Sequence, residues 1–135
     1  GVVVICAGGG GIPTVQLEDG RLIGVEAVID KDLASSLLAQ QLKADAFGML
    51  TDVDAVYDAW LEPAARAFRR VSPQAISAYA FATGSMAPKV EAACEFVEQS
   101  GGIAGIGQLK DAARIMAGEA GTVIASDMDG IRWWP

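Results

Sequence analysis

Short apolar segments alternate with longer amphipathic segments along most of this 135-residue chain. The short segments include "AFGML", "GIAGIG" and "GTVIA", and glycine or acidic residues bound each of them, which is typical of buried strands. The longer segments are "DKDLASSLLAQQLKAD", "SMAPKVEAACEFVEQSGG" and "QLKDAARIMAG", in which apolar residues recur at helical spacing. This alternation predicts an α/β fold with layered helices and a mainly parallel sheet.

The predicted helices carry start and stop signals. Asp30 or Asp32 can cap the first helix, and Pro88 suits the first turn of the second. Glycine follows the second helix at Gly101 and the third at Gly118, where it favours helix termination. The apolar stripe of the first helix comprises Leu33, Leu37, Leu38 and Leu42.

The stretch "VVVICAGGGGIP" runs five apolar residues, Val2 to Cys6, into the glycines at 8–11. The β-branched run predicts a buried strand. Four glycines are more than a turn requires, and they suit a phosphate that approaches the backbone N–H groups. A flexible transition from strand to loop explains them equally well. Because Gly1 lies at the start of a predicted core strand, we expect the sequence to be a piece of a longer protein.

Three further segments have weaker patterns. "LEDGRLIGVEAVI" predicts a hairpin with its turn at Asp19-Gly20. Residues 58–79, which contain prolines and the basic "RAFRR", are predicted to be irregular. The tail "SDMDGIRWWP" follows the last predicted strand, and Trp133 and Trp134 either cover a sheet edge or belong to an appendage.

Composition narrows the classes of protein. With 52% hydrophobic and 20% charged residues the chain is globular. A net charge of −7 argues against a nucleic-acid or anionic-membrane partner. Cys6 and Cys94 lie in apolar segments, which favours reduced thiols and a cytoplasmic location. The absence of histidine excludes Ser-His-Asp and Cys-His nucleophiles and disfavours catalytic zinc, so no metal ligand is assigned.

Four segments fall where strands are predicted to end or helices to begin: "GGGGIP", "DKD", "TDVD" and "GSMAPK". Lys31 and Lys89 lie at predicted helix starts, where the helix dipole and the ammonium group together attract phosphate. Ordinary explanations remain open: Asp30 and Asp32 as helix caps, Lys31 as a solvated side chain, and "TDVD" as a turn. The chain has neither a Walker A nor a GxGxxG motif.

These segments, in this order, resemble the carboxyl-terminal half of the carbamate kinases, a family of the amino acid kinase superfamily. The matching stretches are "CAGGGGIPT", "VEAVIDKDLASSLLAQQLKAD", "LTDVDAVY", "RRVSPQAISAY", "ATGSMAPKVEAACEF" and, more weakly, "AGIGQLKDAARIMAGEAGTVI". They run from Val2 to about Ile124, so the tail goes beyond the resemblance. Ala87 departs from the family, which usually has glycine there.

The resemblance implies a three-layer αβα sandwich in which residues 1–125 form the nucleotide-binding portion and 126–135 a tail of unknown role. It places Lys31 and Lys89 against the transferring phosphoryl group and the nucleotide phosphates, with Asp30 among the lysines to hold them. The positions that correspond to the nucleoside pocket are Thr51, Asp52 and Val53, with Tyr57, Ser85 and Met86 nearby. The positions that would approach the phosphoryl group and its acceptor are Gly8, Gly9, Gly10 and Gly11.

The implied activity is reversible phosphoryl transfer between ATP and carbamate, giving carbamoyl phosphate and ADP with Mg²⁺, in arginine metabolism. Carbamate is already an anion, so cationic charge is needed rather than a histidine base. The family is dimeric in its full-length form. Its first glycine-rich loop and a lid lysine would precede this chain, so we expect the chain alone to be incomplete for turnover.

Two alternatives stay open. One keeps the superfamily and changes the acceptor to acetylglutamate, aspartate, glutamate 5-carboxylate or UMP. The other is a stand-alone nucleotide-binding module without catalysis. Asp58 lies outside the matched stretches, so Asp58→Asn is expected to be nearly neutral.

Overall fold

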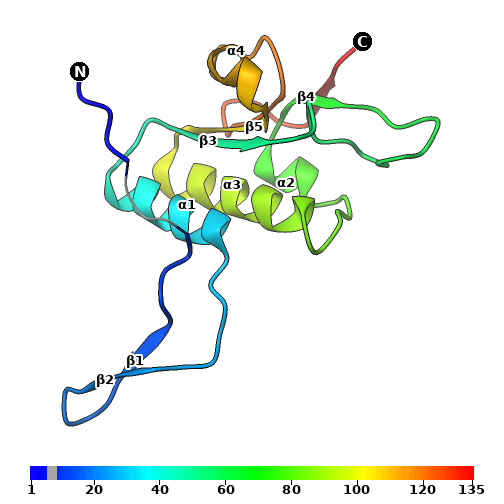
Figure 1. Cartoon of the computed structure of the whole chain (residues 1–135). Coiled ribbons are helices and arrows are strands. Elements are labelled where there is room, and N and C mark those ends of the chain that lie inside the picture. The colour runs from blue at the N-terminus through cyan, green and yellow to red at the C-terminus, as the bar shows by residue number, and fades with distance from the viewer. Residues whose placement is uncertain (6–8) are drawn as a thin grey trace.

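The computed structural model describes residues 1–5 and 9–135, and its centre is a five-stranded sheet (Figure 1). In spatial order the strands are β3 (Ala46–Thr51), β5 (Ile103–Gln108), β6 (Thr122–Ile124), β4 (Phe68–Val71) and β7 (Ile131–Trp133). The β3–β5 and β4–β6 pairs are parallel, whereas the β5–β6 and β4–β7 pairs are antiparallel. The α/β class is confirmed, and the long β3–β5 ladder supplies most of the parallel pairing in a mixed sheet.

Helices cover both faces of this sheet (Figure 1). One face carries α1 (Lys31–Gln41), α2 (Pro73–Ile76) and α3 (Met86–Ser100). The other face carries a 3₁₀ turn (Leu109–Asp111) and α4 (Ala112–Met116). The predicted three-layer αβα arrangement is therefore confirmed. Among the described helices, none is long and apolar enough to cross a lipid bilayer.

Successive residues of β3 and β5 face the two helical layers in turn, one layer with α3 and the other with α4. Phe47 is buried toward α3, where its ring lies 5.5 Å from that of Phe96. Gly105 faces α4, and a Cβ added there would overlap the side chains of Met116 and Ile115. Glycine at this position lets the short α4 approach the sheet closely, since any larger residue would push it away.

The helix signals read from the sequence are confirmed. Asp30 caps α1, because its carboxylate accepts hydrogen bonds from the backbone N–H groups of Asp32 (2.7 Å) and Leu33 (3.2 Å). Gly101 ends α3 with a left-handed φ of 70°. Pro88 lies in the first turn of α3, as expected.

The predicted hairpin is also confirmed. Strand β1 (Thr14–Gln16) pairs antiparallel with β2 (Leu22–Gly24), and Gly20 in the turn has a φ of 84°. The hairpin extends away from the sheet and its helices (Figure 1). Every residue of its two strands is exposed, so it contributes nothing to the core.

The prediction of a buried strand at the amino-terminal end is wrong for Val2 to Ile5. These residues form no strand, and their exposed fractions run from 73% to 98%. Cys6 and Gly8 lie outside the described residues. A strand is stable only when a neighbour supplies hydrogen bonds, and apolar β-branched residues indicate the propensity without providing the neighbour.

Residues 58–79 were predicted to be irregular, and this is wrong, because they contain β4 and α2. In β4, "FRRV", only Phe68 and Val71 are buried. The two arginines between them interrupt the apolar pattern from which a strand is predicted. The tail pairs with it: β7 runs antiparallel to β4, and the Trp133 ring stacks on Phe68 at 4.5 Å. The tail thus covers a sheet edge, one of the two roles considered for its tryptophans.

Candidate functional site

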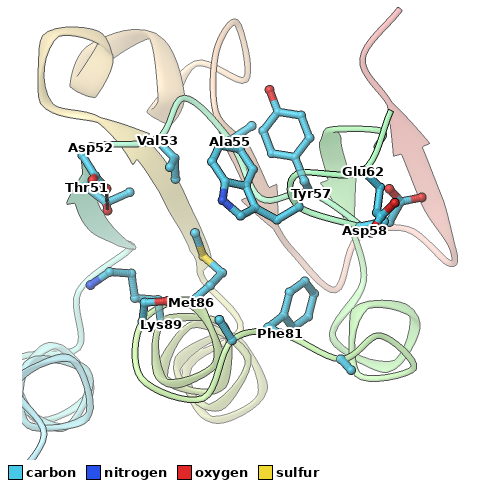
Figure 2. A pocket seen from close by; sticks show the side chains of 15 residues that line it. Thr51, Asp52, Val53, Ala55, Tyr57, Asp58, Glu62, Phe81, Met86 and Lys89 are labelled. Carbon is cyan, nitrogen blue, oxygen red and sulfur yellow. Dashed lines mark hydrogen bonds between the residues drawn. The ribbon is translucent and has the colours of Figure 1, made fainter. Parts of the chain in front are cut away.

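A cavity of about 460 Å³ opens at the carboxyl end of β3 (Figure 2). It lies between the segment that follows β3 and the first turn of α3. Its lining is supplied by Thr51, Asp52, Val53, Ala55, Tyr57, Asp58, Ala59, Trp60, Glu62, Ala80, Phe81, Ala82, Ser85, Met86 and Lys89. All six residues predicted for the nucleoside pocket are in this set, as is the predicted catalytic Lys89. The structure therefore brings them together, although from three separate segments.

The cavity has an apolar part and a polar part. The Met86 side chain points into the space between the two walls, with Val53 and Phe81 on either side (Figure 2). The polar part is formed by Thr51, Asp52 and Lys89. Pockets that combine an apolar surface with a few charged groups are suited to ligands with a flat base and a charged tail.

Lys89 is held in place by a carboxylate of α1. Its Nζ donates to Asp32 Oδ2 at 2.8 Å, and the two side chains are only 14% and 12% exposed. The Nζ of Lys31 lies 3.8 Å from the same oxygen but is largely exposed. One carboxylate thus holds one ammonium group firmly and a second one loosely beside the first turns of α1 and α3.

Sequence reasoning gave the role of holding the lysines to Asp30, and this requires a correction. The contacts to both lysines are made by Asp32, whereas Asp30 accepts backbone hydrogen bonds at the start of α1. The hydrogen bond from the Leu33 N–H is the main cause that lowers the pKa of Asp30, and Lys31 and Lys89 add smaller effects. A single side chain can satisfy the helix end or the ammonium groups, and Asp30 is oriented to the helix end.

The glycine loop lies against the chain's own backbone. A Cβ added to Gly10 would overlap the carbonyl oxygen of Ile29, directly before the cap of α1. Gly11 has a φ of 90°, which only glycine adopts easily, and Gly9 has open space around it. Close packing at the start of α1 therefore explains Gly10 without a ligand. Gly9 to Gly11 do not line the cavity, and the predicted approach to a phosphoryl group stays a prediction.

The far wall of the cavity was not predicted from the sequence. Asp58 accepts hydrogen bonds from the backbone N–H (2.7 Å) and Nε (2.9 Å) of Arg66, and these bonds, the backbone one first, lower the pKa of Asp58. The pair closes the loop that carries Trp60, whose ring lies 5.1 Å from that of Tyr57. Asp58 is thus part of the site, which removes the reason for expecting Asp58→Asn to be neutral.

Among the described residues there is neither a cluster of potential metal ligands nor an activated thiol. Among residues 1–5 and 9–135 no three carboxylate, cysteine or histidine side chains gather as they would around a metal ion. Burial raises the pKa of the Cys94 thiol to about 11, with a further effect from Glu98. A thiol with that pKa stays protonated and is a poor nucleophile at neutral pH.

Comparison with known proteins identifies the family. The model of the amino acid kinase family matches residues 1–106. The chain belongs to the amino acid kinase family. The cavity and the lysine pair lie within the matched residues, as do α1, α3 and β3.

Within the family, the similar proteins include several carbamate kinases. The chain is 49% identical over 136 residues to the carbamate kinase of Rhizobium meliloti, a match that covers 98% of this chain and 42% of that protein. It is 52% identical over 134 residues to the carbamate kinase of Haemophilus influenzae, covering 99% and 43%. The chain therefore spans less than half the length of these relatives. Because the matches extend through the tail, the resemblance does not stop near Ile124.

The solved structures similar to this chain also include carbamate kinases. Carbamate kinase from Giardia lamblia bound to AMP-PNP has a TM-score of 0.82 and 41% identity, with 87% of this chain and 42% of that chain covered. UMP kinase from Bacillus anthracis has a TM-score of 0.58 at 16% identity, which shows a shared fold alone.

Proposed function

We propose that this chain is the ATP-binding portion of a carbamate kinase-like phosphotransferase, which transfers a phosphoryl group reversibly between ATP and carbamate. The observation that carries the proposal is the cavity with Lys89 in its polar part, where Asp32 holds Lys89 and also lies next to Lys31. The similarity to carbamate kinases, one of them bound to AMP-PNP, supports both the nucleotide and the acceptor.

In this proposal the base and ribose of ATP occupy the cavity. The apolar side chains of Val53, Met86 and Phe81 contact the base, and the phosphates extend toward Lys89. Ser85 makes no side-chain cap at the start of α3. Pro88 has no N–H and the Ala87 N–H donates to the Ala82 carbonyl, which leaves the Met86 N–H of this turn to donate to a phosphate. Thr51, Asp52 and Tyr57 complete the nucleoside contacts that were predicted from the sequence.

The remaining residues act on the transferred group. The exposed ammonium of Lys31 faces the phosphoryl group in transit, and Asp32 keeps Lys89 in place as its charge meets the phosphates. Asp30 acts as a positioning residue, because it fixes the first turn of α1 next to Lys31. Gly8, Gly9, Gly10 and Gly11 keep the role that the resemblance implies, which is to approach the phosphoryl group and its acceptor.

The chemistry suits this set of charges. A carbamate oxygen attacks the γ-phosphorus while the bond from that phosphorus to the β,γ-bridging oxygen breaks, giving carbamoyl phosphate and ADP. The nucleophile is already ionised, so the protein need not remove a proton. Bringing two anions together is the main barrier, and fixed cationic groups lower it.

Mg²⁺ neutralises the phosphate charge when it is bound. Magnesium sites in such enzymes often use one or two carboxylates together with substrate phosphates. The lack of a carboxylate cluster among the described residues fits an ion that enters with the nucleotide. Of the carboxylates that line the cavity, we propose Asp52, in its polar part, as the one that would contact the ion.

The proposal extends to the full-length protein. Because the chain spans only 42% and 43% of its first two relatives, the acceptor site needs further sequence. We propose a cytoplasmic homodimer that acts in arginine metabolism.

The test is a kinetic comparison of lysine variants in the full-length protein. Lys89→Ala and Lys31→Ala are expected to lower kcat by about a hundred- to a thousandfold, as loss of one preorganised electrostatic group does. Nucleotide affinity should change much less, because these charges act mainly on the transition state. Lys110→Ala is the matched control, since Lys110 lies outside the cavity lining.

Two results would contradict the assignment. If KM for ATP rose while kcat stayed unchanged, the lysines would provide uniform binding only. If the wild-type protein phosphorylated UMP or acetylglutamate and left carbamate untouched, the acceptor would be wrong and the nucleotide site would stand.

A further inference from the structure

Strands β4 and β7 bring three arginines to one cavity on the α4 side of the sheet. This second cavity has a volume of about 390 Å³. It is lined by Arg69, Arg70, Ala117, Gly118, Val123, Arg132 and Trp133. A gathering of three guanidinium groups is unexpected in a chain with a net charge of −7.

The backbone places these arginines together. Arg70 lies directly opposite Arg132 in the antiparallel β4–β7 pairing, where like charges destabilise a sheet. The register shifts between Phe68 and Arg70, so that Arg69 is the additional residue of the strand. A bulge of this kind re-aims a side chain, and here Arg69 lines the same cavity as Arg70.

The acidic side chains compensate only part of this charge. Asp127 accepts two hydrogen bonds from Arg70, at 2.7 and 3.2 Å, and Arg70 is the main cause of its lowered pKa. Arg69 lies 4.7 Å above the Trp134 ring and makes a long contact of 3.5 Å to the carbonyl of Gly118. In the described part of the chain, the Arg132 side chain makes no hydrogen bond or ion pair. Three cations and one carboxylate leave an excess of positive charge.

This cavity is distinct from the nucleotide cavity. The two share no lining residue, and they lie on opposite faces of β4. Phe68 on the other face packs against Phe81, which lines the nucleotide cavity. The two sites are therefore separated by one layer of sheet.

We infer that Arg69, Arg70 and Arg132 form a binding site for a phosphate group, separate from the site of phosphoryl transfer. Guanidinium groups bind phosphate oxygens through paired, charge-assisted hydrogen bonds, and several of them around one cavity favour a dianion over chloride. A phosphate dianion would also relieve the repulsion between Arg70 and Arg132. The ligand is free phosphate or a phosphomonoester, which share this chemistry.

The test follows the arginine side chains directly. Inorganic phosphate is titrated into the ¹⁵N-labelled full-length protein, and the Nε–Hε signals of the arginines are recorded at constant ionic strength. We expect saturable shifts in the wild-type protein. Arg69→Gln and Arg132→Gln together should weaken this phosphate binding at least tenfold, as loss of charge-assisted bonds does. Arg21→Gln is the matched control, because Arg21 pairs with Asp19 on the remote hairpin.

Each outcome of the titration either supports or overturns the phosphate site. Equal binding by the double variant, shifts that never saturate, or the same shifts with chloride would each overturn the inference. The wild-type titration is informative even if the double variant does not fold, because saturable shifts of Arg69, Arg70 and Arg132 are themselves required. Methyl phosphate is run in parallel: equal affinity points to a phosphomonoester, and much weaker binding points to free phosphate.

Discussion

Asp32 lies two residues after Asp30, the cap of α1, and has a different role. It is 8% exposed, and its carboxylate makes the short contact to Lys89. Asp30, two positions earlier, is satisfied by backbone N–H groups. The two acidic residues of "DKD" therefore have different roles, because the helix turns between them and Asp32 is the one that contacts α3.

This difference predicts the outcome of two matched substitutions in the full-length protein. Asp32→Asn removes the charge that pairs with the nearly buried Lys89, and it should lower the free energy of unfolding by about 1.5–3 kcal/mol. Asp30→Asn should lower stability much less than Asp32→Asn at neutral pH, because asparagine also caps helices and only the contribution of the charge is lost. Thermal or denaturant unfolding of the two variants measures both.

The pH dependence provides a control. The lowered pKa of Asp30 means that its charge contributes stability above its ordinary pKa, and that this contribution is lost as the pH falls through the lowered value. Below about pH 4 the wild type should therefore lose stability more steeply than Asp30→Asn. Equal stability loss for Asp30→Asn and Asp32→Asn at neutral pH would contradict the separate roles.

At the scale of elements, the loop from Asp58 to Arg66 forms one wall of the cavity proposed for the nucleotide. Its ends are joined by the Asp58–Arg66 pair, and the Arg66 guanidinium also lies 4.0 Å from the centre of the Trp133 ring. The loop is thus tied at its base to β7, while Trp60 and Leu61 remain exposed at its tip.

We expect Asp58→Ala to weaken nucleotide binding by about tenfold. Without the Asp58–Arg66 pair the loop is less ordered, and it must then become ordered when the ligand binds. Asp19→Ala is the matched control: Asp19 accepts from the N–H and Nε of Arg21 in the same pattern, but on the remote hairpin. Calorimetric titration of ATP into the full-length variants measures the effect. Equal affinities for Asp58→Ala and Asp19→Ala would show that the loop does not act on the ligand.

Helices were predictable because their signals are local. The cap at Asp30, the early Pro88 and the left-handed Gly101 each act within one turn of the chain. Strand β4 was missed, since its arginines are stabilised by partners far along the sequence, such as Asp127. The run at Val2 to Ile5 shows the converse, because its residues favour a strand that no neighbour completes in this structure.

The candidate site was predictable in part, because some of its residues lie in recognisable sequence motifs. The residues of "TDVD" and "GSMAPK" were found through a resemblance, and all of those predicted line the cavity. Phe81 and Asp58 have no motif of their own, and only the folded chain places them there. Asp32 was visible as an acidic residue, but spacing alone could not decide between a cap and an ion pair.

At the scale of the whole molecule, the cavity proposed for the nucleotide is lined by residues of this chain, whereas the chain spans less than half of its relatives. The 135-residue chain alone should therefore bind ATP or ADP with low affinity and form no measurable ATP from carbamoyl phosphate. Calorimetry and a coupled assay measure the two activities. No binding at millimolar nucleotide would contradict the first expectation, and turnover near the 1–100 per second of typical kinases the second.

The position of β4 in the sheet has a consequence for synthesis on the ribosome. This strand ends at Val71, yet its two neighbours, β6 and β7, begin only at Thr122 and Ile131. At about 5–20 residues per second, β4 emerges several seconds before either neighbour exists. During that interval β3, α1 and α3 can already assemble, whereas Phe68 has no ring of Trp133 to stack on. The nascent chain must therefore leave β4 without its neighbours until β6 and β7 have been made.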